Sequence, residues 1–272
     1  MVCKLTSSLS PINIRNKIIK LISPLLLWSC LGLNGNYAND ITFQDTPNII
    51  YVDKNASGLK TGRSWNDAFT NISQALGQSS LNSSVWIAKG TYPEYITIPA
   101  NVKFYGGFSG NESSLEERVI SNNPTILDGG NQSQRIGPPM TGPVEGIVLT
   151  NSNTIIDGFT IKNGDGRLGY GIYLRGAENV IIKNNLIEEN KAHSLGESGN
   201  YLGGAGIFCS AQNVTIDSNV FRNNQAQNTL SISVGGGIWL SNSKNVNVMN
   251  NIFDKNSAKY GGAICATNSN EI

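Results

Sequence analysis

The stretch NVTIDSNVFRNN, from Asn213 to Asn224, decides the fold because the chain repeats its pattern. Three other stretches align with it without gaps: NTIIDGFTIKNG (153–164), NVIIKNNLIEEN (179–190) and NVNVMNNIFDKN (245–256). Each contains alternating aliphatic residues, then a second apolar pair, then Asn or Gly. Alternation with a period of two is the pattern of a β-strand. The chain therefore repeats one unit made of short strands and turns.

A shorter phrase precedes each stretch and sets the length of the unit. It reads GIVL at Gly146, GIYL at Gly171, GIFC at Gly206, GIWL at Gly237 and AICA at Ala263, so the starts are 25, 35, 31 and 26 residues apart. Strand-like units that repeat at this period are typical of a solenoid. Each unit is predicted to form one coil of a parallel β-helix, with the strands of stacked coils about 4.8 Å apart.

The alignment predicts which side chains lie inside the coils. Residues at one position in successive coils form a file, and inward files should build the core. The predicted inward files are Ile147, Ile172, Ile207, Ile238 and Ile264; Ile156, Ile182, Ile216 and Val248; and Ile161, Ile187, Phe221 and Phe253. Each buried aliphatic side chain contributes about 1.5–3 kcal/mol. No coil can bury its own face, so the stack should be stabilised collectively.

Asparagines recur at two further aligned positions. One position holds Asn185, Asn219 and Asn251, and the other holds Asn190, Asn224 and Asn256. Stacked Asn side chains can bond along a stack as amide ladders, and Asn tolerates left-handed backbone angles at corners. These residues are therefore predicted to be structural.

The N-terminal third is predicted to begin the same solenoid. SWNDAFTNISQAL, from Ser64 to Leu76, is expected to be a helix with Ser64 as its N-cap. Trp65, Phe69, Ile72 and Leu76 would share one face and cover the open first coil. Residues 39–110 are thus expected to form this cap and the first coils, residues 111–145 a polar loop or irregular coil, and residues 146–272 the regular coils.

Residues 1–38 have the features of a secretory signal peptide. Positive residues precede a short apolar run from Leu21 to Leu33, which is too short for a typical membrane span of roughly 20 residues. Cleavage after Ala38 is expected. Two alternatives stay open: a lipoprotein-type cleavage with Cys30 as the lipid-bearing residue, and a retained anchor. All three take the mature chain out of the cytoplasm.

Charge and cysteine content limit the partners and cross-links. Charged residues make up 14% of the chain and the formal net charge is +1, so no broad field exists to attract nucleic acid or an anionic membrane. Outside the leader, which holds Cys3 and Cys30, the chain has Cys209 and Cys265. Alternation turns Cys209 inward and Cys265 outward, two coils apart, at roughly 10 Å. Because a disulfide needs Cα atoms within about 7 Å, no intramolecular bridge is predicted.

Candidate catalytic groups are scattered along the loops. The single His of the chain, His193, lacks flanking glycines. The acids considered are Asp165, Glu188, Glu189 and Glu197, and the bases are Arg167, Arg175 and Lys191. They are not gathered in one motif, so they are interpreted as solvated loop charges. No catalytic residue, metal ligand or cofactor is predicted.

The outward file of the short phrase is the strongest functional signal. If Ile172 and Leu174 point inward, Tyr173 points outward, and the same alternation applies in the next coils. The predicted ladder contains Tyr173, Phe208 and Trp239, extended by Val148 and Cys265. With Arg175, the three aromatics are the candidate glycan-binding residues, because aromatic strips stack on sugar rings. The alternative is that loops cover the aromatics, or that the ladder only stabilises the sheet.

The sequence resembles known β-helix proteins at both ends. Its opening, from YVDKNASG at Tyr51 to FYGGFSG, resembles right-handed parallel β-helix proteins of the pectin-lyase-like superfamily. The later coils are similar to the repeats of polymorphic outer membrane proteins, with Gly-Gly-Ala-Ile at 261–264 and Phe-x-x-Asn at 221–224 and 253–256. The resemblance implies an all-β, right-handed parallel β-helix on a bacterial cell surface, outer-membrane associated or secreted, in contact with polysaccharide or host surfaces.

Departures from the resemblance shape the expected function. The Gly-His-Gly, Asn-Thr-Asp and Asp-Asp motifs of pectin-cleaving hydrolases are absent from the sequence. We therefore expect a non-enzymatic adhesion or glycan-binding protein, and the alternative is a degenerate or incomplete polysaccharide lyase or glycoside hydrolase. GGAICATNSNEI at the C-terminal end begins a new coil. Further coils or a partner are expected at that edge.

Overall fold

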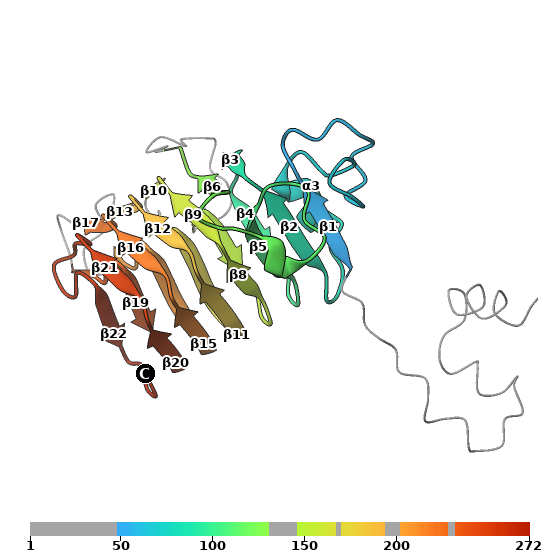
Figure 1. The fold of residues 1–272 in the computed structure, drawn as a ribbon. Helices are drawn as coiled ribbons and strands as arrows, with labels where there is room; N and C mark the ends of the chain where they lie inside the picture. Colours follow the sequence, from blue (N-terminus) through green and yellow to red (C-terminus); the bar gives the residue numbers. More distant parts are fainter. Residues whose placement is uncertain (1–47, 131–145, 167–169, 194–201, 228–231) are drawn as a thin grey trace, which may run out of the picture. The chain divides into compact units, whose positions relative to one another are not determined.

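A computed structural model describes residues 48–130, 146–166, 170–193, 202–227 and 232–272. The predicted leader, with its cleavage site at Ala38, and Arg167 and Glu197 lie outside the described residues. Within them, strands run side by side in coil after coil, from β1 (Ile49–Val52) to β22 (Ile264–Thr267) (Figure 1). Every strand pairing is parallel and joins one coil to a neighbouring coil. The predicted β-helix is therefore confirmed.

The largest sheet has 11 strands and consists of two halves that share β11 (Ile172–Lys183) and β15 (Ile207–Asp217). The leading half contains β4 (Ile96–Ile98), β7 (Val148–Thr150), the first residues of β11 and β15, β19 (Ile238–Ser241) and β22. The trailing half contains β1, β2 (Ser84–Ala88), β5 (Lys103–Phe108), β8 (Ile155–Asp157), the last residues of β11 and β15, and β20 (Lys244–Met249).

The remaining sheets complete each coil. A 6-stranded sheet contains β3 (Gly90–Tyr92), β6 (Thr125–Asp128), β9 (Phe159–Lys162), β12 (Leu186–Glu188), β16 (Val220–Arg222) and β21 (Ile252–Asp254). A 3-stranded sheet contains β10 (Asp165–Gly166), β13 (Lys191–His193) and β17 (Gln225–Gln227). β14 (Leu202–Gly203) pairs with β18 (Ser233–Val234).

The register confirms the predicted core. Ile172 pairs with Ile207, Ile207 with Ile238, and Ile238 with Ile264. The other two files are in register as well. The file of Ile156 extends upstream through Phe104, and the file of Ile161 extends upstream through Leu127. The members of the three files belong to or pack against one continuous hydrophobic core, except Ile264, which is 36% exposed. Stacking of like side chains over like side chains thus builds the interior.

The file that contains Ile172 departs from the predicted register at its upstream end. Val148, not Ile147, pairs with Ile172, and Leu149 pairs with Tyr173. Ile147 lies in the corner before the strand, where its N–H donates to the carbonyl oxygen of Tyr170 at 2.9 Å. Both Ile147 and Val148 are fully buried. The prediction that Val148 points outward is therefore wrong, because the corner residue also turns inward and shifts the alternation by one.

Asparagine ladders close the corners as predicted. Asn190 donates through Nδ2 to Oδ1 of Asn224 at 3.0 Å, and Asn224 donates in the same way to Asn256 at 2.9 Å. The left-handed backbone angles, however, belong to other residues. They fall on the residue before each ladder Asn, such as Glu189 with φ 56° and Asn223 with φ 54°. The ladder Asn itself turns inward because its amide satisfies the carbonyl and N–H groups of the bend.

The N-terminal helix is shorter than predicted. α3 spans Ile72–Gly77, and its N-cap is Asn71, whose side chain accepts the N–H of Gln74 at 2.9 Å. Ser64 instead accepts the N–H of Asp67 and closes a turn. Phe69 exchanges backbone hydrogen bonds with β1, accepting from Asp53 and donating to Tyr51. The open edge of β1 needs such partners, so Phe69 forms a β-bridge with Val52, and the rest of the segment before Ile72 consists of turns and bends rather than a helix.

Residues 111–130, expected to be a polar loop or irregular coil, contain a strand. A short 3-10 helix, η1 (Leu115–Glu117), is followed by β6, which pairs with β3 on one side and β9 on the other. β6 places Leu127 in the core between Tyr92 and Ile161. Residues 131–145 lie outside the described part of the chain. The β-helix therefore continues through β6, although the polar composition of the surrounding stretch predicts a loop.

Candidate functional site

The predicted aromatic file exists on the outer face of the leading half. Tyr173 pairs with Phe208, Phe208 with Trp239, and Trp239 with Cys265. Tyr173, Phe208 and Trp239 alternate with inward Ile, Leu and Cys residues along the same strands. The file results from the register alone, because β11, β15 and β19 place the residue after each inward Ile on the outside.

The rings of this file are stacked and mostly covered. Tyr173 and Phe208 are stacked at 5.0 Å between centroids, and Trp239 meets Phe208 edge-on at 5.0 Å. Tyr173 is 7% exposed and Trp239 8%, while Phe208 is half-buried. The register agrees with the predicted outward direction of these side chains, and the alternative in which the chain covers the aromatics holds for Tyr173 and Trp239.

Tyr170 stacks on two rings of the file. Its ring stacks on Tyr173 at 5.6 Å and on Phe208 at 5.4 Å, with interplanar angles of 17° and 25°. Tyr170 is itself 3% exposed. Ala192 and Ala205 complete this small hydrophobic cluster outside the main core. The sequence reasoning missed Tyr170, although it stands directly before the Gly-Ile phrase of the same coil.

A polar file runs beside the aromatic file. Arg175 of β11 pairs with Ser210 of β15. In the two coils that follow, Ser241 of β19 pairs with Thr267 of β22. Arg175 is exposed, and Ser210 and Ser241 are half-buried. Thr267 accepts a hydrogen bond from Nε1 of Trp239 at 3.0 Å. Hydroxyl groups and one guanidinium group therefore occupy the strand position two residues after the aromatic file.

The candidate acids and bases do not converge. Glu188 is paired with Arg222 at 2.5 Å across adjacent coils. Glu189 occupies a left-handed corner, and Lys191 lies on β13 beside Asp165 of β10. His193 lies in register with Gln227 on β17. In the part of the chain that the structure describes, no group of three or more His, Cys, Asp or Glu residues could hold a metal ion.

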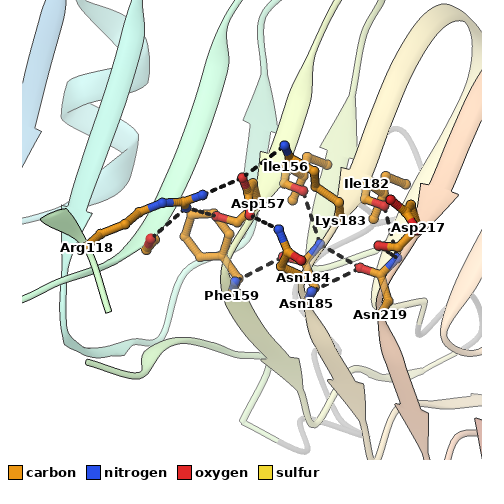
Figure 2. A network of polar contacts seen from close by, with 11 residues as sticks. Arg118, Ile156, Asp157, Phe159, Ile182, Lys183, Asn184, Asn185, Asp217 and Asn219 are labelled. Atoms are coloured by element: carbon orange, nitrogen blue, oxygen red, sulfur yellow. Dashed lines mark hydrogen bonds and ion pairs between the residues drawn. The ribbon is translucent and has the colours of Figure 1, made fainter. Parts of the chain in front are cut away.

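An ion-pair network absent from the sequence prediction lies on the trailing half (Figure 2). Oδ2 of Asp157 lies 2.5 Å from Nη2 of Arg118 and 3.7 Å from Nζ of Lys183, and Oδ1 accepts Nδ2 of Asn184 at 2.9 Å. Asp157 is 1% exposed and Arg118 11%. Arg118 also donates to the carbonyl oxygen of Gly106 at 3.1 Å. Every polar atom of this carboxylate is therefore occupied by the fold.

Arg118 belongs to a segment that covers an outer aromatic cluster. Its guanidinium carbon lies 5.2 Å from the ring centroid of Tyr105, which packs with Trp86 and Phe108. Burial raises the pKa of Tyr105, the Asp157 carboxylate raises it further, and Arg118 opposes the rise. The aligned residues Asp157, Lys183 and Asp217 could have indicated a charged file in the sequence. Nothing in the sequence points to Arg118, which comes from a segment far from them in the chain.

Among the described residues, the two cysteines Cys209 and Cys265 are both free and occupy different environments. Cys209 is fully buried in the core, where burial raises its pKa to about 11. Cys265 is half-buried in the outward file, and burial also raises its pKa. The register agrees with the prediction for both orientations, because Cys209 pairs with inward Leu240 and Cys265 with outward Trp239.

A shallow cleft lies elsewhere, between α3 and β4. It has a volume of about 250 Å³ and is lined by Ser73, Leu76, Gly77, Tyr95, Ile96, Thr97 and Pro99. Its lining contains no Asp, Glu, His, Lys or Arg residue. Among the described residues, no helix is long and apolar enough to cross a membrane.

Part of the chain matches a family of known proteins that agrees with this architecture. A family model described as "Right handed beta helix region" matches residues 140–272. The crystal structure of the deglycosylated pectin methylesterase from Aspergillus niger is similar with 10% sequence identity and a TM-score of 0.32, and the match covers 82% of this chain and 90% of that one. The search of curated proteins finds no match. The parallel strand pairing, together with this match over the C-terminal part of the chain, shows the fold of a right-handed parallel β-helix.

Proposed function

We propose that this chain is an exported, non-enzymatic β-helix protein that binds carbohydrate on cell surfaces through the outer face of its leading half. The observation that carries the proposal is the file of Tyr173, Phe208 and Trp239, which holds an aromatic ring at one position in three successive coils. An aromatic ring on the outside of a β-helix contributes nothing to the main core. Aromatic faces beside hydroxyl groups suit sugar rings, which present both apolar C–H faces and hydroxyl edges.

The carboxylates support a non-enzymatic role. Cleavage of a glycosidic bond by acid–base catalysis needs carboxyl groups placed on either side of the bond. Here Asp157 is held by Arg118 and Asn184, and Glu188 is held by Arg222. Glu112 accepts the N–H groups of Ser109, Gly110 and Asn111. Each of these acids thus has a role in stabilising the coils.

The test is a binding assay on the mature chain with a panel of soluble polysaccharides and a glycan array. We expect Phe208→Ala and Arg175→Ala to weaken binding at least fivefold while the melting temperature of Arg175→Ala stays unchanged. Tyr260→Ala removes an aromatic side chain that is 52% exposed on the last coil and serves as the matched control. Release of sugar fragments during the assay would instead favour a lyase or hydrolase. No binding by the folded protein to any glycan would refute the proposal.

A further inference from the structure

The outer face of the 6-stranded sheet carries two files of side chains that neither the core nor the proposed function uses. The register stacks an apolar outward file, made of Ile126, Thr160, Leu186, Val220 and Ile252. Two residues further along each strand it stacks a charged file, made of Asp128, Lys162, Glu188, Arg222 and Asp254. None of these residues is buried, and Ile252 is 61% exposed.

The charged file alternates in sign at every step from one coil to the next. Charged residues make up only 14% of the chain, so its composition does not explain an unbroken file of them. Pairing within the chain explains it only in part. Glu188 and Arg222 form an ion pair at 2.5 Å. Among the described residues, however, the side chains of Lys162 and Asp254 have no hydrogen-bond or ion-pair partner.

We propose that this face binds a second copy of the chain, with the coils of the two copies stacked in opposite directions. The two-fold axis lies in the contact plane, parallel to the strands, between the coil of Glu188 and the coil of Arg222. Glu188 then faces Arg222 of the second copy, and Lys162 faces Asp254 of the second copy. Because a two-fold interface places one patch against itself, a file of a single sign repels its copy, whereas an alternating file attracts it.

The signs of the charges decide where the axis lies. An axis through a coil would oppose like charges, because positions that are an even number of coils apart have the same sign. An axis between two coils opposes unlike charges at every contact. Among such positions, only the one between Glu188 and Arg222 gives partners to both Lys162 and Asp254. The same position lays Thr160 of the second copy over the exposed Ile252.

The size of the face predicts a weak dimer. Sheets that pack face to face lie about 10 Å apart, a gap that Lys and Asp side chains from the two sides can span. The strands of the four overlapping coils have only three or four residues each. Such a contact buries less than the roughly 800 Å² per partner of a standard interface. The dissociation constant should therefore be micromolar or higher, and high salt should raise it further.

The experiment measures the molecular mass of the mature chain by sedimentation equilibrium, at concentrations from micromolar to several hundred micromolar. The variants are Lys162→Glu, Asp254→Lys and the double variant with both changes. Each single reversal opposes like charges twice in the dimer, because the two-fold axis repeats every contact. We expect each to raise the dissociation constant about tenfold or more. The double variant restores unlike charges and should dimerise within about threefold of the parent chain.

The double variant separates dimerisation from a role within one chain. Inside the chain it places Glu beside Glu188 and Lys beside Arg222, so a purely intrachain role predicts that it is worse than either single variant. Lys103→Glu makes the same charge change at an exposed position of β5, in another sheet, and should leave dimerisation unchanged. Circular dichroism checks folding. Should a reversal fail to fold, Lys162→Gln and Asp254→Asn must each weaken the dimer instead.

Three results would overturn the inference. A parent chain that stays monomeric at every concentration has no such interface. A dimer that the folded Lys162 and Asp254 variants leave unchanged uses another face. A folded double variant that dimerises no better than the single variants places the axis elsewhere. The proposed function is unaffected by any of these results, because the aromatic file lies in a different sheet.

Discussion

Asn185 and Asn219 are joined twice: the backbone N–H and the Nδ2 group of Asn185 both donate to Oδ1 of Asn219, each at 3.0 Å. Nδ2 of Asn185 also donates to the carbonyl oxygen of Ile156 at 3.1 Å. One amide therefore links three coils and satisfies the backbone of a bend that is buried. A side chain without both a donor and an acceptor could not replace it.

Replacement of a buried ladder residue should be costly. Asn219→Ala removes the acceptor for two N–H groups of Asn185 and a donor to the carbonyl oxygen of Ile182. Each buried polar group left without a partner costs about 1–3 kcal/mol, so we expect a loss of at least about 3 kcal/mol. Denaturant unfolding followed by circular dichroism measures it.

The exposed ladder provides the matched control. Asn213 bonds to Asn179 at 3.2 Å and to Asn245 at 2.8 Å, but its side chain lies in water. Asn213→Ala should cost about 1 kcal/mol, mainly because Asn tolerates its left-handed φ of 55°. Equal losses for the two variants would show that the inward ladder is not the stabilising one.

The buried ion pair should be sensitive to removal of one partner. Asp157→Asn leaves the guanidinium of Arg118, 11% exposed, without its carboxylate. Breaking a buried pair in this way costs about 3–5 kcal/mol. We expect the low end of this range, because Arg118 keeps its bond to the carbonyl oxygen of Gly106. Thermal unfolding provides the measurement.

Glu188→Gln serves as the control for that prediction. Arg222 in its pair is 43% exposed, so water screens the interaction and the loss should stay below about 1 kcal/mol. High salt should also reduce the Glu188 effect more than the Asp157 effect. Comparable losses for the two pairs would contradict the burial argument.

A left-handed corner offers a stabilising substitution. Glu189 has φ 56°, and the aligned residues Asn163 and Asn223 adopt the same conformation. Left-handed angles cost a residue with an ordinary side chain about 1–2 kcal/mol, and Asn less. Glu189→Asn should therefore raise the unfolding free energy by about 0.5–1 kcal/mol. Lys191→Asn, at an exposed strand position nearby, should not, and a gain there would point to charge rather than backbone strain.

The two thiols should differ in reactivity. Because burial raises the pKa of Cys209 to about 11, it holds almost no thiolate at pH 8 and is shielded from reagents. Cys265, half-buried, should be alkylated first, and peptide mapping by mass spectrometry separates the two sites. Labelling of Cys209 in the native protein at a rate similar to Cys265 would mean that its coil is open.

The same pKa implies loss of stability in alkali. The folded protein holds the Cys209 proton more tightly than a free thiol with its pKa of 9.0. The stabilisation is therefore complete below pH 9 and is lost as the pH rises through about 11. Cys209→Ala should remove this alkaline dependence, whatever its effect on stability at neutral pH.

The sequence by itself determined the coil and its core. A period-two alternation, repeated in aligned units, places Ile172 over Ile207 and Asn190 over Asn224 without knowledge of any other contact. It likewise determined which cysteine lies inside. These features follow from local geometry, because neighbouring coils repeat the same residues at the same positions.

Only the tertiary structure decided what breaks the repeat. The shift at Val148, the β-bridge at Phe69 and the ring of Tyr170 depend on neighbours from other coils or from corners between strands. Arg118 reaches Asp157 from a segment with no repeat at all. Alternation predicts whether the side chain of a strand residue points inward or outward, but not whether another segment of the chain covers that side chain. The exposure of Tyr173 and Trp239, and hence the state of the candidate site, was therefore decided by contacts between segments distant in the chain.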